Sequence, residues 1–463
     1  MMNRVEDVFG VNNKIIKTYH ERAFVDGKLK QALSSNKHIV IYGQSKQGKT
    51  SLLNKCLLEE NRLSINCSND TTVQDIYNDI LKSEGVKIET SSKINGSEEV
   101  SVTPKLSANI NFGIVKGTGG VSGESKEING YEAEYTSITY DLSKAKNIAE
   151  ILIEKSMTKK IIIEDFHYLS EDCQKKFAYD LKIFFEKGII FIILGIWKEK
   201  DKLIQYNREL TDRLEFISVE PWEEKDFNEI FLLGQKELDI SIPVKIKYMI
   251  TSNSFNNVGI FQELCKYTSL NCINRNSKEV TEEDFENALE FKKETYFNQH
   301  QRILEKIANN DSGKLYLAYY FVKCIFDTRN EKLVNGLNKK YILFRMTQSY
   351  HDKSQDLENV ISRFLNTSLK DIQIKLEISP LIFDYDRQDD IFRILDSTLL
   401  FFLHNTDKRK VFEGMSIPDE LDRLIKESKD IEIPPNRVAA YQVFLEMFDY
   451  ADNNEIKRKF LDM

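Results

Sequence analysis

Hydrophobic and polar residues alternate along the first half of the chain in a way that predicts strands and helices in turn. Short apolar runs predict buried strands, and apolar positions three and four residues apart predict the helices between them. The predicted strands lie at residues 38–42, 63–68, 159–163, 189–197 and 215–219, and the helices at 72–84, 143–155, 171–187 and 198–209. This order predicts an α/β fold, a doubly wound parallel sheet with a ligand site at the carboxyl ends of its strands.

Helical spacing without strands follows the sheet. It predicts a helical lid of four helices, at residues 223–239, 243–252, 259–267 and 281–298. Thr281 and Asp284 have the spacing of a capping box at the start of the last one. Farther along, the pattern predicts a helix at 315–326, two helices joined by a turn between 358 and 378, and a hairpin that turns at 387–390. Two helices followed by a hairpin is the order of a winged helix.

Alternation with a period of two returns between residues 88 and 141, around a glycine-rich stretch at 117–120. We interpret this segment as an inserted β-hairpin or small meander, with a loop of no function as the alternative. The chain then has four predicted parts. They are an α/β core at 1–222 with the insertion at 88–141, a helical lid at 223–309, a winged-helix-like domain at 310–405 and a helical tail at 406–463.

Composition limits the class of protein. The 463 residues are 41% hydrophobic and 30% charged, which is enough apolar material for several cores. The 65 Lys and Arg against 73 Asp and Glu leave a net charge of -8, so no overall field attracts polyanions. The six cysteines form no C-x-x-C pair, the longest apolar run is 189–197, and the N-terminus carries Glu6 and Asp7 where a signal peptide is apolar. We expect a cytoplasmic protein with free thiols, no zinc site and no membrane segment.

The most specific motif follows the first predicted strand. Gly43-x-x-x-x-Gly48-Lys49-Thr50 lies between that strand and a helical pattern, which is the arrangement of a P-loop. Glycines let the backbone curl so that successive N–H groups point at phosphate oxygens, at the positive end of the following helix. Lys49 is expected to reach the β- and γ-phosphates of ATP, and the Thr50 hydroxyl to bind Mg2+. The expected ATP-binding residues of the loop are Gly43, Gln44, Ser45, Lys46, Gln47, Gly48, Lys49, Thr50 and Ser51.

Two acidic residues end the third predicted strand, where a P-loop ATPase needs carboxylates. Three isoleucines precede Glu164 and Asp165. One carboxylate holds Mg2+, and the other orients and deprotonates the attacking water. The order predicts Glu164 as the metal ligand and Asp165 as the base, with exchanged roles or slow hydrolysis as alternatives because the usual order is Asp and then Glu. His167 either polarises the attacking water or is a satisfied histidine at the edge of the site.

With these motifs, the chain resembles the AAA+ and STAND ATPases over about residues 19–293, in particular the origin-recognition-like branch and the bacterial ATPases of phage-defence loci. The resemblance implies an N-terminal box in which Tyr19 and Arg22 contact adenine. It also implies an arginine finger at Arg213 that reaches the nucleotide of a neighbouring subunit. A plain helix start and a surface ion pair are the respective alternatives for these residues.

The chain departs from the family pattern at two places. Gly195 lies at the end of the fourth predicted strand, where the family has a polar residue, sensor 1, that touches the γ-phosphate or the attacking water. The turn at 256–259 lies where the family carries a sensor 2 arginine or a G-x-P signature, and it has neither, with Gln262 as a weak stand-in. Both departures point to slow hydrolysis.

Three functions follow. The first is a cytoplasmic ATPase that binds ATP and Mg2+, forms a homo-oligomer and transmits its nucleotide state to a protein partner. Anti-phage defence is implied by the resemblance alone, and an effector activity would lie on the partner. The second is a nucleotide-dependent switch or scaffold with little turnover. The third is a DNA-binding remodelling ATPase that uses the hairpin and the winged helix, where Lys370, Gln373 and Lys375 are the few polar candidates.

Overall fold

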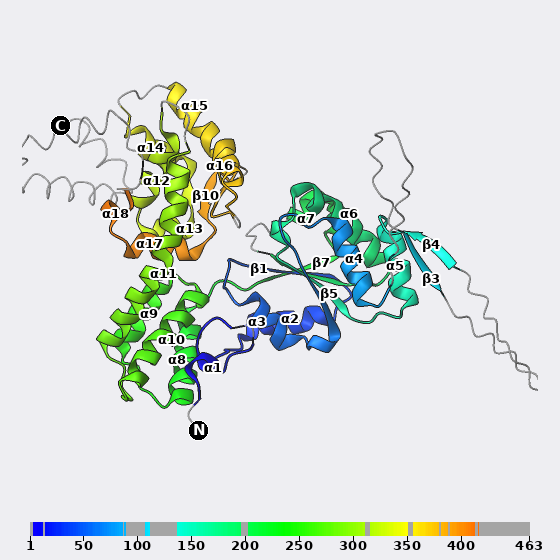
Figure 1. Ribbon diagram of the computed structural model, residues 1–463, viewed down its shortest axis with the longest axis horizontal. Coiled ribbons are helices and arrows are strands. Elements are labelled where there is room, and N and C mark those ends of the chain that lie inside the picture. Colours follow the sequence, from blue (N-terminus) through cyan, green and yellow to red (C-terminus); the bar gives the residue numbers. More distant parts are fainter. Residues whose placement is uncertain are drawn as a thin grey trace, which may run out of the picture. The chain divides into compact units, whose positions relative to one another are not determined.

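The computed structural model describes residues 3–12, 14–86, 88, 107–111, 137–195, 202–310, 315–350, 355–378, 381–387, 389–412 and 415. Contacts between residues divide the chain into two compact units, and Figure 1 labels most of their elements. The first unit comprises residues 1–300, 329–339 and 373–406, and the second comprises 301–328, 340–372 and 407–463. The range 310–405, predicted as a winged-helix-like domain, therefore contributes to both units.

A parallel sheet forms the centre of the first unit. Within the described residues its five strands lie in the order β2-β5-β6-β1-β7, and each neighbouring pair is parallel. The strands are β1 (His38–Tyr42), β2 (Arg62–Asn66), β5 (Lys160–Glu164), β6 (Phe191–Gly195) and β7 (Leu214–Ser218). The doubly wound α/β fold is confirmed, with strand bounds that differ from the predicted ones by a few residues.

The two faces of this sheet are covered by different helices (Figure 1). α2 (Ala23–Leu33) and α3 (Lys49–Cys56) pack on one face, and α4 (Val73–Ser83), α5 (Ala145–Glu154) and α6 (Glu171–Glu186) pack on the other. On β5, Ile162 belongs to the first core, whereas Ile161 and Ile163 belong to the second, because successive side chains of a strand point to opposite faces. Strands buried on both faces are continuous apolar runs, which is why the sequence predicts them well.

The predicted lid helices follow β7. They are α8 (Glu224–Leu238), α9 (Val244–Ser254), α10 (Val258–Asn274) and α11 (Glu282–Ala308). α10 and α11 continue past their predicted ends, because buried residues such as Cys272 and Leu304 keep the helical spacing. The predicted capping box is present: the Thr281 N–H donates to Asp284 Oδ2 at 2.8 Å, and the Asp284 N–H donates to Thr281 Oγ1 at 3.4 Å.

The N-terminal segment packs against the lid. The short helix α1 (Val5–Val8) contacts α8 and α10, and Phe9 is fully buried after it. The ring of Phe9 lies over Gly234 of α8, where an added Cβ would stand 1.9 Å from the ring atom Cζ. Only glycine permits this close approach, so the sequence of α8 determines where the N-terminal segment docks.

The first unit also holds the C-terminal hairpin. Among the described residues, β8 (Leu337–Asn338), β9 (Phe383–Asp386) and β10 (Ile391–Ile394) form an antiparallel sheet in the order β8-β10-β9, followed by α17 (Ser397–Asn405). The predicted hairpin is therefore present. The second unit contains α12 (Leu317–Phe326), most of α14 (Lys339–Thr347), α15 (Gln355–Arg363) and α18 (Lys408–Phe412).

The predicted turn between two helices at 358–378 is wrong. α15 passes through a π-helical segment, Phe364–Ser368, directly into α16 (Leu369–Lys375). Such a π segment lets the helix absorb an extra residue without breaking. The Gln373 side chain is fully buried and hydrogen-bonds the backbone of Ile382 and Phe383, so it is directed to the hairpin and not to solvent.

Two stretches of the predicted insertion are described. β3 (Ser107–Asn111) and β4 (Ser137–Asp141) pair as an antiparallel ribbon, in keeping with the expected hairpin. Most of the remaining insertion, and the predicted tail after residue 415, lie outside the described residues. Over the described ranges, every helix is too short or too polar to cross a bilayer.

Candidate functional site

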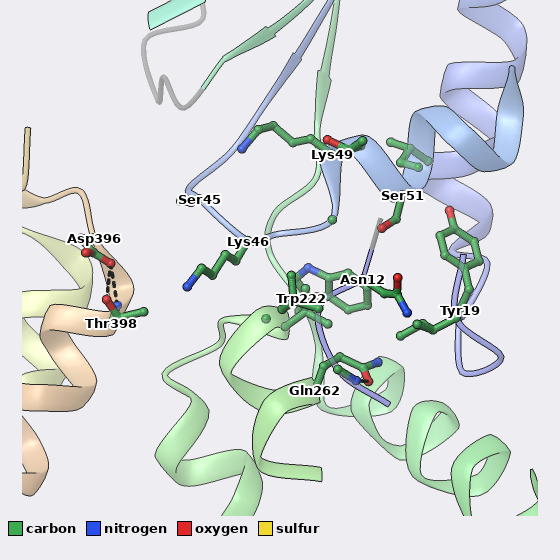
Figure 2. A pocket seen from close by; sticks show the side chains of 18 of the residues that line it. Asn12, Tyr19, Ser45, Lys46, Lys49, Ser51, Trp222, Gln262, Asp396 and Thr398 are labelled. Atoms are coloured by element: carbon green, nitrogen blue, oxygen red, sulfur yellow. Dashed lines mark hydrogen bonds between the residues drawn. The ribbon is translucent and has the colours of Figure 1, made fainter. Parts of the chain in front are cut away.

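A cavity of about 560 Å³ lies at the carboxyl ends of the strands of the first unit, within the size range of small-molecule sites. Its walls come from the N-terminal segment at 10–22, the P-loop and the start of α3, the turn after β5, Trp222, the start of α10 and residues 395–398. Figure 2 shows that Tyr19, Ser51 and Asn12 lie on one side of the P-loop, whereas the Lys46 side chain extends on the other side toward Asp396 and Thr398.

The P-loop has the curled backbone that its glycines predict. Gly43 and Gly48 have positive φ values of 153° and 86°, and a Cβ on Gly43 would stand 2.5 Å from a methyl group of Val219. Lys49 Nζ lies inside the curl and donates to the carbonyls of Gly43 and Gln44 at 2.9 and 2.8 Å. Burial lowers the pKa of Lys49 to about 8, although Glu220 and Asp165 nearby favour its charged form.

The two acids after β5 have different surroundings. Asp165 lines the cavity with Lys49 and Thr50, in a left-handed conformation with φ of 55°. Burial raises the Asp165 pKa and Lys49 opposes this shift. Glu164 is not among the described residues that line the cavity. Burial and Asp165 raise its pKa, and Arg62 opposes the rise.

His167 lies in the turn after β5 (Phe166–Tyr168) and lines the same cavity. Its Nδ1 atom is buried and has no hydrogen-bond partner among the described residues. Burial and the charge of Lys49 lower the pKa of His167 to about 4, so the imidazole is neutral at pH 7. The interpretation of His167 as a satisfied histidine does not hold for Nδ1.

Glu220, at the end of β7, braces the P-loop from outside. Its carboxylate accepts from the backbone N–H of Gln44 and from the side chain of Gln47, both at 3.0 Å. Gln47 is 2% exposed, and its amide also donates to the Asn256 carbonyl at 3.2 Å and accepts from the Val258 N–H at 3.3 Å. A single P-loop side chain therefore connects the sheet edge with the first residues of α10.

Asn257 connects the lid to the P-loop a second time. This fully buried side chain accepts from the Ile260 N–H at 3.0 Å and so caps α10. Its amide donates to the Ser45 carbonyl at 3.0 Å and to Ser397 Oγ, at the start of α17, at 2.5 Å. The turn that lacks the sensor 2 arginine is thus in direct contact with the phosphate-binding loop, and Gln262 farther along α10 also lines the cavity.

The other end of the cavity is built around Tyr19 and Trp222. Tyr19 OH donates to Asp26 at 2.5 Å, and Arg22 donates to the Val219 carbonyl at 2.9 Å. The Arg22 guanidinium stacks 3.7 Å from the centroid of the Trp222 ring, and burial lowers the Arg22 pKa. Both residues of the predicted adenine-contacting box line the cavity, and much of the donor capacity of Arg22 is directed at the protein itself.

Two predicted features lie elsewhere. Arg213 is not among the described residues of the cavity; its guanidinium bonds the Glu209 carbonyl and stands 3.9 Å from the carboxylate of Glu186. An arginine finger acts on another subunit, so the prediction for Arg213 stays a prediction. Gly195 is the last residue of β6, which neighbours β5 in the sheet. It therefore provides no polar side chain at the position expected for sensor 1.

The residues present fit ATP with Mg2+. The glycine curl, the buried Lys49 ammonium and the helix start of α3 provide a phosphate cradle. In the part of the chain that the structure describes, no cluster of three or more His, Cys, Asp or Glu residues holds a metal by itself. Mg2+ beside a nucleotide needs few protein ligands, because phosphates and water supply the rest, and Thr50 and Asp165 share the cavity with Lys49.

The strand order decides the class of fold. β1, which leads into the P-loop, lies between β6 and β7, the acid-ended β5 follows β6, and a helical lid comes after β7. This is the parallel sheet of a P-loop NTPase, followed by a helical lid.

Similar solved structures include a Walker-type ATPase of Pyrococcus abyssi, with 13% identity, a TM-score of 0.45 and coverage of 87% of this chain and 98% of that chain. Cdc6p from Pyrobaculum aerophilum has 12% identity and a TM-score of 0.40, covering 88% and 100%. The ORC1 protein of Aeropyrum pernix, solved in complex with DNA, has 9% identity and a TM-score of 0.41, covering 89% and 96%. These values are too low to bear on activity. Neither a scan of family models nor a search of curated proteins gave a match.

Sequence reasoning missed three contributors to the site. Glu220 and Trp222 follow directly on the fifth strand, and the convergence of strand ends in a parallel sheet would have drawn attention to them. Asn257 precedes a helical run, which is the signal of an N-cap. Its second role, the contact with the P-loop, has no signal in the sequence because it depends on how the lid packs.

Proposed function

We propose that this protein binds ATP with Mg2+, hydrolyses it, and passes its nucleotide state to the lid and through the lid to a partner. The observation that supports this most is the position of Lys49, buried inside the glycine curl and in the same cavity as Asp165 and Thr50. The fold adds the lid that such a device needs.

In the proposed reaction, Lys49 exchanges its two loop carbonyls for the β- and γ-phosphates and neutralises their charge. Thr50 and a carboxylate would hold Mg2+, which would supply further neutralisation of the phosphate charge. Of the two acids after β5, Asp165 is the one that lines the cavity, and its raised pKa suits a group that accepts a proton from the attacking water. The metal role predicted for Glu164, or an exchange of the two roles, remains a prediction.

The contacts of Gln47 and Asn257 support the coupling step. A phosphate that binds the P-loop acts on the same peptide units that these two side chains connect to α10, and Asn257 also reaches Ser397 of α17. Nucleotide binding and lid position are then linked in both directions, as any two coupled equilibria are.

The finer parts of this proposal rest on the resemblance. They are assembly into a homo-oligomer with Arg213 as a finger, a protein partner that carries the effector activity, and a role in anti-phage defence. A switch with little turnover is a second candidate, since Gly195 and the turn at 256–259 lack the expected sensor side chains.

DNA remodelling is a weaker candidate. The β9–β10 hairpin, residues 383–394, carries four Asp against two Arg, and an acidic hairpin repels phosphates. Gln373, one of the three predicted DNA contacts, is fully buried. Protein partners therefore suit this part of the chain better than DNA does.

Replacement of Lys49 by Ala tests the central proposal. Calorimetric titration with ATP and Mg2+ is expected to show binding by the wild type and a loss of affinity of at least about a hundredfold in Lys49→Ala, since a buried cation that meets phosphate oxygens is removed. Lys82→Ala, which removes an exposed lysine of α4 outside the cavity, is the matched control and should leave affinity unchanged. Equal ATP affinity in the wild type and Lys49→Ala would refute the assignment.

A further inference from the structure

One side chain of the lid holds both ends of a segment that lines the cavity. Gln262 of α10 is buried, its Oε1 accepts from the backbone N–H of Gly10 at 3.3 Å, and its Nε2 donates to Thr18 Oγ1 at 3.3 Å. Thr18 is fully buried, and its hydroxyl donates to the Val8 carbonyl. We call residues 10–12 and 14–18 the N-terminal wall, because most of them line the cavity. This wall is therefore fastened to the lid through Gln262.

The next residue of α10 fastens the same wall. The Val11 N–H donates to Glu263 Oε1 at 3.1 Å, and Glu263 Oε2 pairs with Nζ of the buried Lys292, on α11, at 2.9 Å. Gly10 has a positive φ of 114°, and an added Cβ there would stand 2.9 Å from Cδ of Lys266. The wall approaches α10 closely at a position that favours glycine, so its docking on the lid is built into the sequence.

The N-terminal wall lies away from the phosphate end of the cavity. Lys49 marks that end, because it is expected to reach the β- and γ-phosphates. Figure 2 shows Asn12 of the wall on the same side of the P-loop as Ser51, and in this view Trp222 lies between Lys49 and Gln262. A nucleotide with its phosphates at Lys49 extends along the start of α3 to this side, so its sugar and base meet the wall.

We propose that Gln262 is a positioning residue that holds the N-terminal wall against the sugar and base of a bound nucleoside triphosphate and does not bind the phosphates. The proposal rests on the proposed nucleotide site. It gives a separate role to the residue that the resemblance offers as a stand-in for the sensor 2 arginine. A loosened wall then weakens binding of the whole nucleotide and leaves binding of a bare phosphate chain unchanged.

The test compares ATP with inorganic tripolyphosphate, which has a chain of three phosphates but no sugar or base. ATP affinity is measured by calorimetry on the full chain with Mg2+, and tripolyphosphate affinity by its competition with ATP. Gln262→Met keeps the length of the side chain but leaves the Gly10 N–H and the Thr18 hydroxyl without this partner. We expect a loss of about fivefold or more in ATP affinity, while tripolyphosphate affinity changes less than about twofold.

Variants of Thr18 test the same contact from the wall. Thr18→Val removes the hydroxyl and should lose ATP affinity as Gln262→Met does, whereas Thr18→Ser keeps the hydroxyl and should retain most of the affinity. Thr268→Val on α10 is the matched control, because Thr268 is buried outside the cavity and its Oγ1 has no hydrogen-bond partner among the described residues. It should leave both affinities unchanged. These variants leave Gln262 in place, so they test the proposal even where Gln262→Met folds poorly.

The outcomes separate the two proposals. Equal losses of ATP and tripolyphosphate affinity in Gln262→Met and Thr18→Val, or unchanged ATP affinity in both, would overturn the role of Gln262 and leave the nucleotide site in place. A wild-type protein that does not bind ATP, or whose bound ATP is not displaced by tripolyphosphate, would overturn the proposed function, and the role of Gln262 with it.

Discussion

The contact between the lid and the P-loop predicts the effect of a single change, Asn257→Asp. Asp keeps the side-chain oxygen that caps α10 by accepting from the Ile260 N–H, but it removes the amide donor. The Ser397 hydroxyl can rotate and donate to the new carboxylate. The Ser45 carbonyl has no hydrogen to donate, so it loses the hydrogen bond from the Asn257 amide. It then faces the negative charge of the new carboxylate, at a position that is fully buried.

The size of the effect follows from this single lost contact. A buried acceptor left without its donor costs about 1–3 kcal/mol, and the added charge moves the value toward the upper end. The lid supplies a wall of the cavity through Val258, Gly259 and Gln262, so weaker docking of the lid weakens nucleotide binding. At about 1.4 kcal/mol per factor of ten, ADP and ATP affinities should both fall by about five- to a hundredfold.

The assay is calorimetric titration with ADP and with a non-hydrolysable ATP analogue, together with thermal unfolding. Asn276→Asp is the matched control, because it adds the same charge to an exposed residue just after the other end of α10. Affinities in Asn257→Asp that stay within about twofold of the wild type would refute the reasoning. A selective loss of the ATP analogue alone would also count against it, since the lid wall is common to both nucleotides.

Two other predictions concern charge and packing. Because the Lys49 pKa is about 8 in the nucleotide-free protein and bound phosphates favour its charged form, nucleotide binding takes up a proton above that pH. Affinity should therefore fall by up to about tenfold per pH unit from pH 8 to 9.5, and a flat calorimetric profile would contradict this. Gly234→Ala should destabilise the protein by about 1–3 kcal/mol in thermal or urea unfolding, since its Cβ would overlap Phe9. Gly27→Ala in α2 is the control, because nothing lies within 4 Å of its new Cβ; it should be neutral or stabilise the protein by up to about 1 kcal/mol. An equal loss of stability in the two variants would show that the overlap with Phe9 is not the cause.

Much of the α/β core was predictable because its strands are buried on both faces. Continuous apolar runs, such as the three isoleucines of β5, are typical of strands buried on both faces of a sheet. The glycine spacing of the P-loop is recognisable because these glycines are needed for its curled backbone. The helices of the lid were predictable in number, but α10 and α11 are longer than predicted. Their ends depend on which residues, such as Leu304, the rest of the unit buries.

The C-terminal part was harder to predict for the same reason. The Asn, Thr and Ser near 366–368 are typical of a turn, yet the chain passes through a π-helical segment there. Buried neighbours such as Phe364 and Leu365 override that local preference. The same residue type can also serve two roles. Gln373 on a helix could contact DNA or hydrogen-bond the neighbouring hairpin, and only the packing of the helix shows that it does the second.

The sequence by itself determined the elements whose causes are local: the strands, the phosphate loop with Lys49 and Thr50, and the acids that end β5. Tertiary structure decided which of the two acids lines the cavity, that Glu220 and Gln47 brace the loop, that Asn257 joins it to the lid, and that His167 has an unpaired nitrogen. These contacts join residues up to 212 positions apart in the chain. Spacing in the sequence carries no information on such pairs, because their geometry is set by how helices pack on the sheet and not by the preferences of neighbouring residues.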